Sequence, residues 1–297
     1  MPRRDELRVR DPFVVAYEDT YYLYVGKADN TVYCYTSNNL EDWQEMAAVF
    51  TIPKDSWSYR DVWAPEVHRL NGKFYLFVSL KGRNGLRGTQ VAVSDTPVGP
   101  FVPVTNRPIT PAGHSCIDAT LFVDGDVPYI IYSHDWPDNY VKDKDAYIGE
   151  IWAAQVDSDL VNIVGEPFRL FASDESPISS KTPHHIEYEG KETIRYGSDA
   201  PFMQRMTGGE LLLTWSPYLD GNYVVLSVVS QSGNIRGPWK HLPEPLFDKN
   251  GGHAMFFKTF EGKQMMCLHQ PECPPMERAH FFYVEEREGI LGIKAEL

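Results

Sequence analysis

Residues 64–78, APEVHRLNGKFYLFV, contain two strand-forming stretches joined by Asn71-Gly72. An Asn-Gly pair between two such stretches is a strong signal for a tight β-hairpin turn. The second stretch is rich in aromatic and aliphatic residues, a composition that favours a strand packed on both faces. This segment therefore predicts two antiparallel strands that meet at Asn71-Gly72.

Four other segments have the same shape, with a short opening, an apolar stretch, a turn with Gly or Asp, and a second apolar stretch. They are DPFVVAYEDTYYLYV from Asp11, DATLFVDGDVPYIIY from Asp118, APFMQRMTGGELLLTW from Ala200 and HAMFFKTFEGKQMMCL from His253. Successive starts lie 53, 54, 82 and 53 residues apart, and this spacing is close to the repeat of known β-propeller blades. We expect an all-β fold in which residues 1–297 form a single domain, a five-bladed β-propeller with four-stranded antiparallel blades.

The long third interval indicates an insertion of about 28 residues beyond the repeat spacing, within the stretch from Ser133 to Tyr196. Loops that decorate a regular scaffold often carry specificity, although this stretch could equally extend an outer strand. Four residues are plausible rim or sugar-subsite residues, with structural roles at least as likely for each: His134, Trp136, His269 and Arg278.

The composition disfavours several classes of function. A net charge of −13 repels phosphate backbones, so we expect no nucleic-acid partner. The four cysteines are scattered, without a zinc or disulfide pattern. No apolar run of about 18 residues predicts a membrane span. No signal peptide is visible, so the protein is intracellular or has lost a leader, and its compartment stays open.

Each first strand of a propeller blade lines the central channel, so the starts of the five repeats should meet at one mouth of it. The polar or aromatic residues there are Asp11, Trp63, Glu66, Asp118, Asp199 and His253. Aspartate is a poor strand former, and several carboxylates at one cavity raise the pKa of at least one of them. Glycoside hydrolysis uses such a group, since one carboxylic acid protonates the leaving oxygen while a carboxylate activates water.

The motifs at these positions resemble glycoside hydrolase family 43, five-bladed propeller enzymes that act on arabinose- and xylose-containing glycans. The matching motifs are Arg10-Asp11-Pro12, Trp63-Ala64-Pro65-Glu66, Ile117-Asp118-Ala119, Asp199-Ala200-Pro201 and Gly252-His253-Ala254. They cover almost the whole chain in the family's order.

The resemblance implies a role for each matching residue in an inverting mechanism. Asp11 corresponds to the general base, and Asp118 to the carboxylate that tunes and orients the acid. His253 corresponds to a histidine that helps to hold a cation, often calcium, although a plain core histidine fits equally. Trp63 is a candidate wall of the sugar site, and Glu66 would bind substrate or the scaffold.

The general acid stays open, because the family usually has Glu where this chain has Asp199. Asp199 could act as the acid with a shifted backbone. Glu187, from the insertion, could reach in instead, while Asp199 binds sugar hydroxyls. In a third interpretation the acid is missing, which leaves a weak enzyme or a binding protein.

The leading hypothesis is an exo-acting glycosidase of an oligo- or polysaccharide, an α-L-arabinofuranosidase or β-xylosidase in type. The alternatives are an endo-acting arabinanase and a propeller that binds glycans without catalysis. We expect no cofactor for the chemistry, because no phosphate-binding loop or dinucleotide fingerprint occurs. A structural calcium near His253 is the one metal that the resemblance suggests.

Overall fold

The computed structural model describes residues 1–297, except for the side chain of Met46. Five four-stranded antiparallel sheets follow one another along the chain, and we number them I to V. Sheet I holds β1 (Phe13–Tyr17), β2 (Thr20–Lys27), β3 (Thr31–Ser37) and β4 (Gln44–Thr51). Sheet II holds β5 (Ser58–Leu70), β6 (Lys73–Gly82), β7 (Arg87–Ser94) and β8 (Val102–Pro103).

Sheets III to V repeat this order from one edge to the other. Sheet III holds β9 (Cys116–Asp124), β10 (Val127–His134), β13 (Glu150–Gln155) and β14 (Phe168–Ala172). Sheet IV holds β17 (Asp199–Arg205), β18 (Leu211–Ser216), β21 (Leu226–Ser230) and β22 (Lys240–His241). Sheet V holds β23 (Gly252–Lys258), β24 (Gln264–Gln270), β25 (Arg278–Arg287) and β26 (Ile290–Glu296). The predicted all-β fold of four-stranded antiparallel sheets is confirmed.

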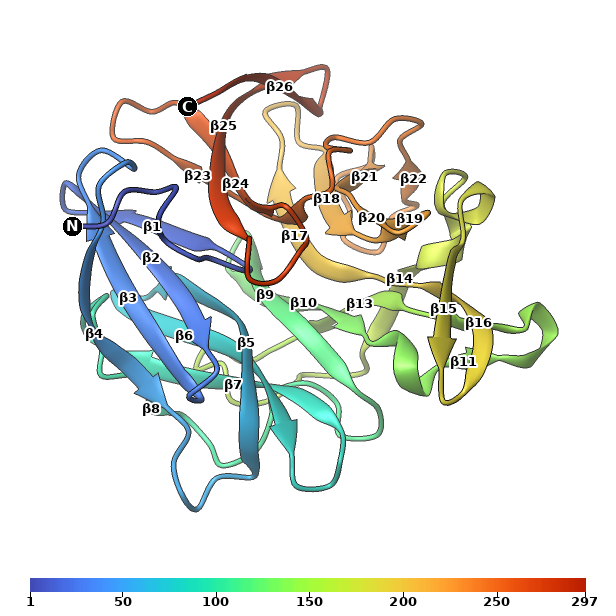
Figure 1. The fold of residues 1–297 in the computed structure, drawn as a ribbon, viewed down its shortest axis with the longest axis horizontal. Helices are drawn as coiled ribbons and strands as arrows, with labels where there is room; N and C mark the ends of the chain where they lie inside the picture. Colours follow the sequence, from blue (N-terminus) through green and yellow to red (C-terminus); the bar gives the residue numbers. More distant parts are fainter.

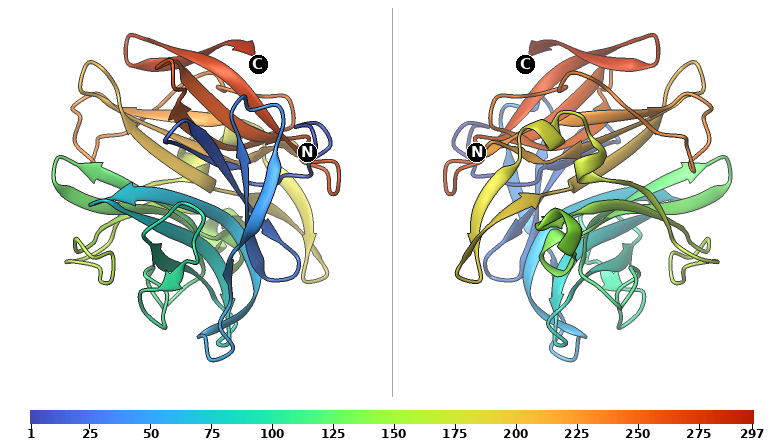
Figure 2. Two further views of the ribbon diagram at one scale, coloured as in Figure 1. Left: turned by 90° about the vertical axis from the view of Figure 1, so that its left-hand side faces the viewer. Right: turned by 90° about the vertical axis from the view of Figure 1, so that its right-hand side faces the viewer.

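The first strands of the five sheets contact one another in a closed circle. β1 contacts β5, β5 contacts β9, β9 contacts β17, β17 contacts β23, and β23 contacts β1. Figure 1 shows these strands toward the middle of the molecule, with the later strands of each sheet further out. Both chain ends lie on the same side of the molecule (Figure 2), where Arg4 Nη2 donates to the Leu297 carbonyl at 3.0 Å.

The hydrophobic core consists mainly of five clusters, one in each gap between neighbouring sheets. Adjacent residues on each second strand face opposite gaps, because side chains alternate along a strand. These pairs are Leu23 and Tyr24, Leu76 and Phe77, Ile130 and Ile131, Leu212 and Leu213, and Met265 and Met266. Burial on both faces explains why these strands read as continuous apolar runs.

The predicted turn at Asn71-Gly72 joins β5 to β6, with φ of +50° and +79°. Two consecutive positive φ angles are those of the tight hairpin turn that Asn-Gly favours.

The insertion forms a sheet of its own, which the sequence did not predict. Its order is β11 (Tyr140–Val141), β12 (Ala146–Ile148), β16 (Lys191–Tyr196) and β15 (His184–Tyr188), with β12 and β16 parallel. A small ribbon pairs β19 (Tyr218–Leu219) with β20 (Asn222–Tyr223). Four 3₁₀ turns are η1 (Trp136–Asp138), η2 (Lys142–Lys144), η3 (Ser173–Glu175) and η4 (Ser179–Lys181). Figure 1 shows β15 and β16 at the periphery, away from β1 and β5.

Candidate active site

One residue in or just before the first strand of each sheet has the same unusual backbone conformation. The left-handed residues are Asp11, Ala64, Asp118, Ala200 and His253, with φ between +44° and +57°. In sheets II to V the ladder between the first two strands shifts register at this point. Such bulges re-aim side chains, and non-glycine residues in this conformation cost roughly 1–3 kcal/mol and cluster at functional sites.

The left-handed positions define which predicted site residues are equivalent. Asp11, Asp118 and His253 occupy this position in sheets I, III and V, whereas Ala200 occupies it in sheet IV. Asp199 therefore sits one residue earlier than the other two aspartates, and its side chain leaves the strand from a different position.

The preceding sheet in the circle holds several of these backbones through a side chain on its second strand. Asp118 N–H donates to Ser79 Oγ at 2.8 Å, and His253 N–H donates to Ser216 Oγ at 2.9 Å. Asp11 N–H donates to His269 Nδ1 at 3.2 Å. Because each bond crosses from one sheet to the next, the packing of the sheets fixes the direction of these side chains.

Asp11 lies among positively charged groups. Its Oδ1 is 3.1 Å from His253 Nδ1, and its Oδ2 is 3.7 Å from Arg10 Nε. Burial acts to raise the pKa of Asp11, but the charges of His253 and Arg10 outweigh burial and hold this pKa well below its usual range. Asp11 is therefore ionised at neutral pH, the state that a base needs.

A second histidine supports Asp11 from behind. His269 is fully buried, and its Nε2 is 2.6 Å from Glu272 Oε2. Since Nδ1 accepts the Asp11 N–H, the ring proton is assigned to Nε2, which donates it to Glu272. Glu272 also accepts two bonds of 2.9 Å from Arg10 Nη1 and one of 2.8 Å from Tyr218 Oη.

Three further carboxyl groups have raised pKa values. Burial raises the pKa of Asp118, although its Oδ2 accepts the Ala200 N–H at 3.1 Å. Burial and the charges of Asp118 and Asp135 raise the pKa of Asp199. Burial, with the charge of Asp118, raises the pKa of Asp135 to about 7. These acids lie close enough to affect one another, so the predicted crowding of carboxylates is present.

Trp63 and Arg87 form one wall beside this cluster. The guanidinium carbon of Arg87 lies 3.3 Å from the centre of the Trp63 ring, and its Nη2 donates to Asp61 Oδ2 at 2.9 Å. Trp63 is 43% exposed, so a face of its ring is open to a ligand. Glu66 is buried, and its Oε2 lies 2.8 Å from His68 Nε2, an arrangement that serves the scaffold.

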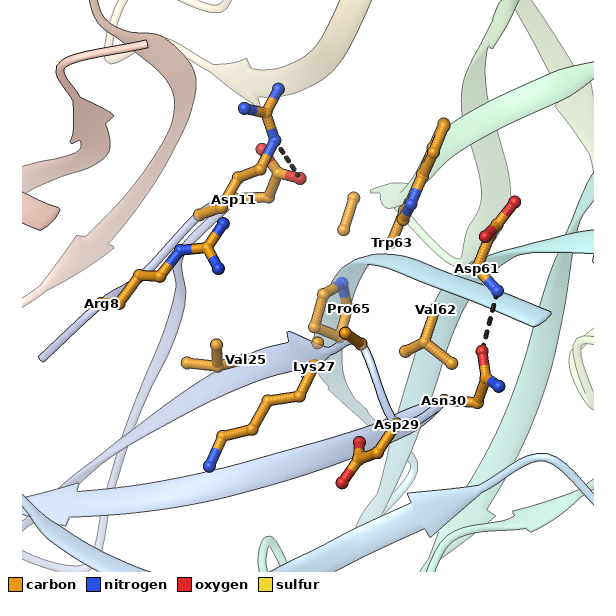
Figure 3. Close-up of a pocket in the computed structure, with 14 residues that line it drawn as sticks. Arg8, Asp11, Val25, Lys27, Asp29, Asn30, Asp61, Val62, Trp63 and Pro65 are labelled. Carbon is orange, nitrogen blue, oxygen red and sulfur yellow. Dashed lines mark hydrogen bonds and ion pairs between the residues drawn. The ribbon is translucent and has the colours of Figure 1, made fainter. Parts of the chain in front are cut away.

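A pocket of about 680 Å³ opens beside Asp11 and Trp63. Its lining comes from sheets I and II and the segments that lead into them. Figure 3 shows Asp11 and Trp63 at one end of the pocket, with Lys27 and Asp29 at the other. The volume lies within the range of small-molecule sites, about 300–1,000 Å³.

Glu187 is placed differently from the competing acid candidate. It is exposed on β15 and pairs in register with Glu192 of β16. Within the described residues, no hydrogen bond or ion pair joins it to Asp11, Asp118 or Asp199.

The remaining predicted rim residues lie around the site rather than within the carboxyl cluster. Trp136 packs edge-on against Tyr188 of the inserted sheet, at 4.9 Å between ring centres. His134 Nε2 lies 3.0 Å from Asp138 Oδ1. Burial acts to lower the pKa of His134, but the carboxylates of Asp138 and Glu150 outweigh it and raise this pKa to about 9. Arg278 donates to the Asp5 carbonyl at 2.7 Å and so fastens the N-terminal segment.

His253 lies against the Asp11 carboxylate, at 3.1 Å between His253 Nδ1 and Asp11 Oδ1. The Asp11 carboxylate outweighs the effect of burial and raises the pKa of His253 to about 9, so its ring is a cation itself. Among the described side chains, no group of three His, Cys, Asp or Glu is arranged to bind a metal ion. Calcium near His253 stays a prediction, and we assign it no step.

Three residues of the site were missed by sequence reasoning: Asp135, Glu272 and Arg87. His269, expected at the rim, instead contacts the Asp11 backbone. Asp135 follows the second strand of sheet III, and His269 is the second-last residue of the second strand of sheet V. Each stands near the end of a second strand, across from the left-handed residue of the first strand, and this position in the repeat was the signal that could have identified both residues. Arg87 begins β7 and Glu272 lies in the connection between β24 and β25, and neither belongs to a motif shared between repeats.

No helix among the described residues is both long and apolar enough to cross a membrane. The model of glycosyl hydrolases family 43 matches residues 6–291. An endo-arabinase from Bacteroides thetaiotaomicron has a similar structure, with a TM-score of 0.87, 34% identity, and coverage of 97% of this chain and 98% of that chain. A thermostable family-43 glycoside hydrolase gives a TM-score of 0.81, 26% identity, and coverage of 97% and 93%.

Two curated relatives match shorter segments. A xylosidase/arabinosidase from Bacteroides ovatus is 41% identical over 76 residues, 26% of this chain and 22% of that protein. A beta-xylosidase from Xylanibacter ruminicola is 29% identical over 154 residues, 52% of this chain and 43% of that protein. The matched segments thus span less than half of either relative.

Proposed function

The chain belongs to glycosyl hydrolases family 43, and on that premise we propose that it hydrolyses arabinose- or xylose-containing glycans with inversion of configuration. The observation that carries this proposal is the cluster of differently charged carboxyl groups beside the pocket. Asp11 is ionised, while Asp118, Asp135 and Asp199 have raised pKa values. A base and an acid with separated pKa values are what single-displacement hydrolysis needs.

The fold that we propose for this enzyme is a single five-bladed β-propeller over residues 1–297. Two observations support it. The first strands contact one another in a circle, and a hydrophobic cluster fills each gap, including the gap between sheets I and V. In such a fold the left-handed residues lie at one mouth of the central channel.

In the proposed mechanism Asp11 accepts a proton from water as the water attacks the anomeric carbon. His253 and Arg10 keep Asp11 ionised, and the bond from its N–H to His269 fixes its backbone. The attack comes from the side of the sugar opposite the leaving oxygen, so the configuration inverts.

Asp199 is the general acid that the geometry supports better than Glu187. Burial and the charge of Asp118 raise its pKa, so Asp199 holds a proton at neutral pH and can give it to the leaving oxygen. Asp118 acts through this charge and orients the neighbouring strand by accepting the Ala200 N–H. Glu187 is exposed to water on the inserted sheet.

We propose that the enzyme is exo-acting, and the position of the insertion supports this. Arg195 of the inserted strand β16 is close enough to Asp199 for its charge to act on that carboxyl, so the inserted sheet lies on the Asp199 side of the site. The pocket is lined from sheets I and II. A site that is closed on one side cleaves sugars from the end of a glycan chain, whereas an open groove binds and cleaves the interior of the chain.

An endo-acting arabinanase is the second candidate, and two observations favour it. The pocket reaches from Asp11 to Lys27 and Asp29, which leaves room for more than one sugar. The similar structure with 34% identity is named as an endo-arabinase.

A screen of aryl arabinofuranosides and aryl xylosides, followed by proton NMR of the released anomer, tests the proposal. We expect turnover with inversion, and a loss of at least about 100-fold in kcat for Asp11→Asn. Unchanged turnover in Asp11→Asn would remove the catalytic assignment. Product lengths from debranched arabinan and from xylan separate exo from endo action.

A further inference from the structure

A second pocket, of about 340 Å³, lies between sheets II and III and carries an unusual charge. Its lining contains two arginines, Arg83 and Arg87, and no carboxylate. The other lining residues are Trp57, Asn84, Leu86, Pro108, Pro111 and Ala112. In a chain with a net charge of −13, a pocket of this sign is suited to an anion.

Both arginines have donor capacity left over. Arg83 is exposed and donates only to the backbone carbonyls of Ser56 and Lys54, at 3.0 and 3.4 Å. Within the described residues no carboxylate pairs with it. Arg87 pairs with Asp61 through Nη2, but its buried Nη1 has no hydrogen-bond partner. A buried N–H without a partner is destabilising, and a bound acceptor removes that cost.

This pocket lies on the same end of sheet II as the candidate active site. Ser58, at the start of β5, pairs with Gly82 at the end of β6, so the hairpin that carries Arg83 and Arg87 adjoins the start of β5. Arg87 also stacks on Trp63, which lines the larger pocket. One guanidinium therefore connects the two pockets.

We propose that this second pocket, the arginine pocket, is a subsite for a hexuronate unit of the glycan. The subsite rests on the proposed function, because it recognises a charged sugar on the chain bound at Asp11. Guanidinium groups bind carboxylates through two parallel hydrogen bonds, and the half-buried Trp57 offers an apolar ring to the sugar.

Calorimetry with the full-length protein tests this subsite. The probes are a xylo-oligosaccharide with one glucuronate branch, the same oligosaccharide without the branch, and a galacturonate oligosaccharide. We expect at least one uronate probe to bind roughly tenfold more tightly than the neutral one, the size of one charge-assisted hydrogen bond. Salt should weaken the binding of that uronate probe only.

Arg83→Gln should remove this preference and leave the affinity for the neutral probe unchanged. Arg107→Gln is the matched control, because Arg107 is also exposed but donates to Val161 O and Asn162 Oδ1 outside the pocket. Equal binding of charged and neutral probes overturns the subsite, as does an equal effect of the two substitutions. Binding needs no turnover, so a protein that prefers uronates but cleaves neither aryl glycosides nor arabinan nor xylan would refute the proposed function and leave the subsite standing.

Discussion

Removal of the His269 ring tests whether the backbone of Asp11 must be held for catalysis. His269→Ala leaves the Asp11 N–H without its 3.2 Å acceptor and Glu272 without its 2.6 Å donor. An unpaired buried donor costs about 1–3 kcal/mol, which corresponds to a loss of roughly 5- to 150-fold if it falls on the transition state. We expect kcat to fall within that range, while KM stays within about threefold because His269 is fully buried behind Asp11.

A conservative variant separates positioning from general destabilisation. In His269→Asn the side-chain oxygen can occupy the place of Nδ1 and accept the Asp11 N–H, but the side chain is too short to reach Glu272. We expect His269→Asn to recover most of the kcat lost in His269→Ala. Steady-state kinetics on an aryl glycoside, with urea unfolding as the stability control, measures both. The reasoning fails if His269→Ala keeps the wild-type kcat, or if both variants lose activity only in proportion to their unfolded fraction.

Three further predictions concern the acids and their supports. Asp199→Asn should lower kcat by about 10²–10⁴-fold on glycosides with poor leaving groups and far less on nitrophenyl glycosides, whereas Glu187→Gln should change neither; the reverse pattern would make Glu187 the acid. Asp135 keeps its proton up to about pH 7 when folded but loses it near pH 4 when unfolded, so it lowers stability as pH rises through that window. Asp135→Asn should therefore raise the free energy of unfolding by roughly 1–4 kcal/mol at pH 8 and by little at pH 4, and equal changes at both values would contradict this. Ser79→Ala removes the acceptor of the Asp118 N–H and should cost about 1–3 kcal/mol in urea unfolding together with a lower kcat; a stable variant with full kcat would show that this bond does not orient Asp118.

Much of the fold could be predicted from the repeat, because residues that are neighbours in the sequence signal each turn and each strand. Asn71-Gly72 specifies a turn by its own φ preferences, and adjacent apolar residues such as Leu76 and Phe77 signal a strand buried on both faces. The pairing of β12 with β16 could not be read in this way. Those strands are parallel and joined by a long connection, so no turn between them sets their register.

The site was predictable where it follows the repeat and obscure where it depends on contacts between sheets. Asp11 and Asp118 stand at equivalent positions of their repeats, so the repeat spacing alone predicts that they lie near one another. The choice between Asp199 and Glu187 depends on how the insertion folds back. His269 and Asp135 acquire their surroundings only when neighbouring sheets close, and hydrogen bonds such as that from Asp11 N–H to His269 join residues 258 positions apart.

The bonds that cross between sheets also determine how this enzyme should lose activity. Asp118 is held from sheet II, His253 from sheet IV and Asp11 from sheet V. Loosening of any one of these interfaces releases a residue of the candidate active site, wherever on the interface the loosening begins. Heat inactivation should therefore coincide with the earliest separation of two sheets, and a species that is partly unfolded yet fully active should not accumulate.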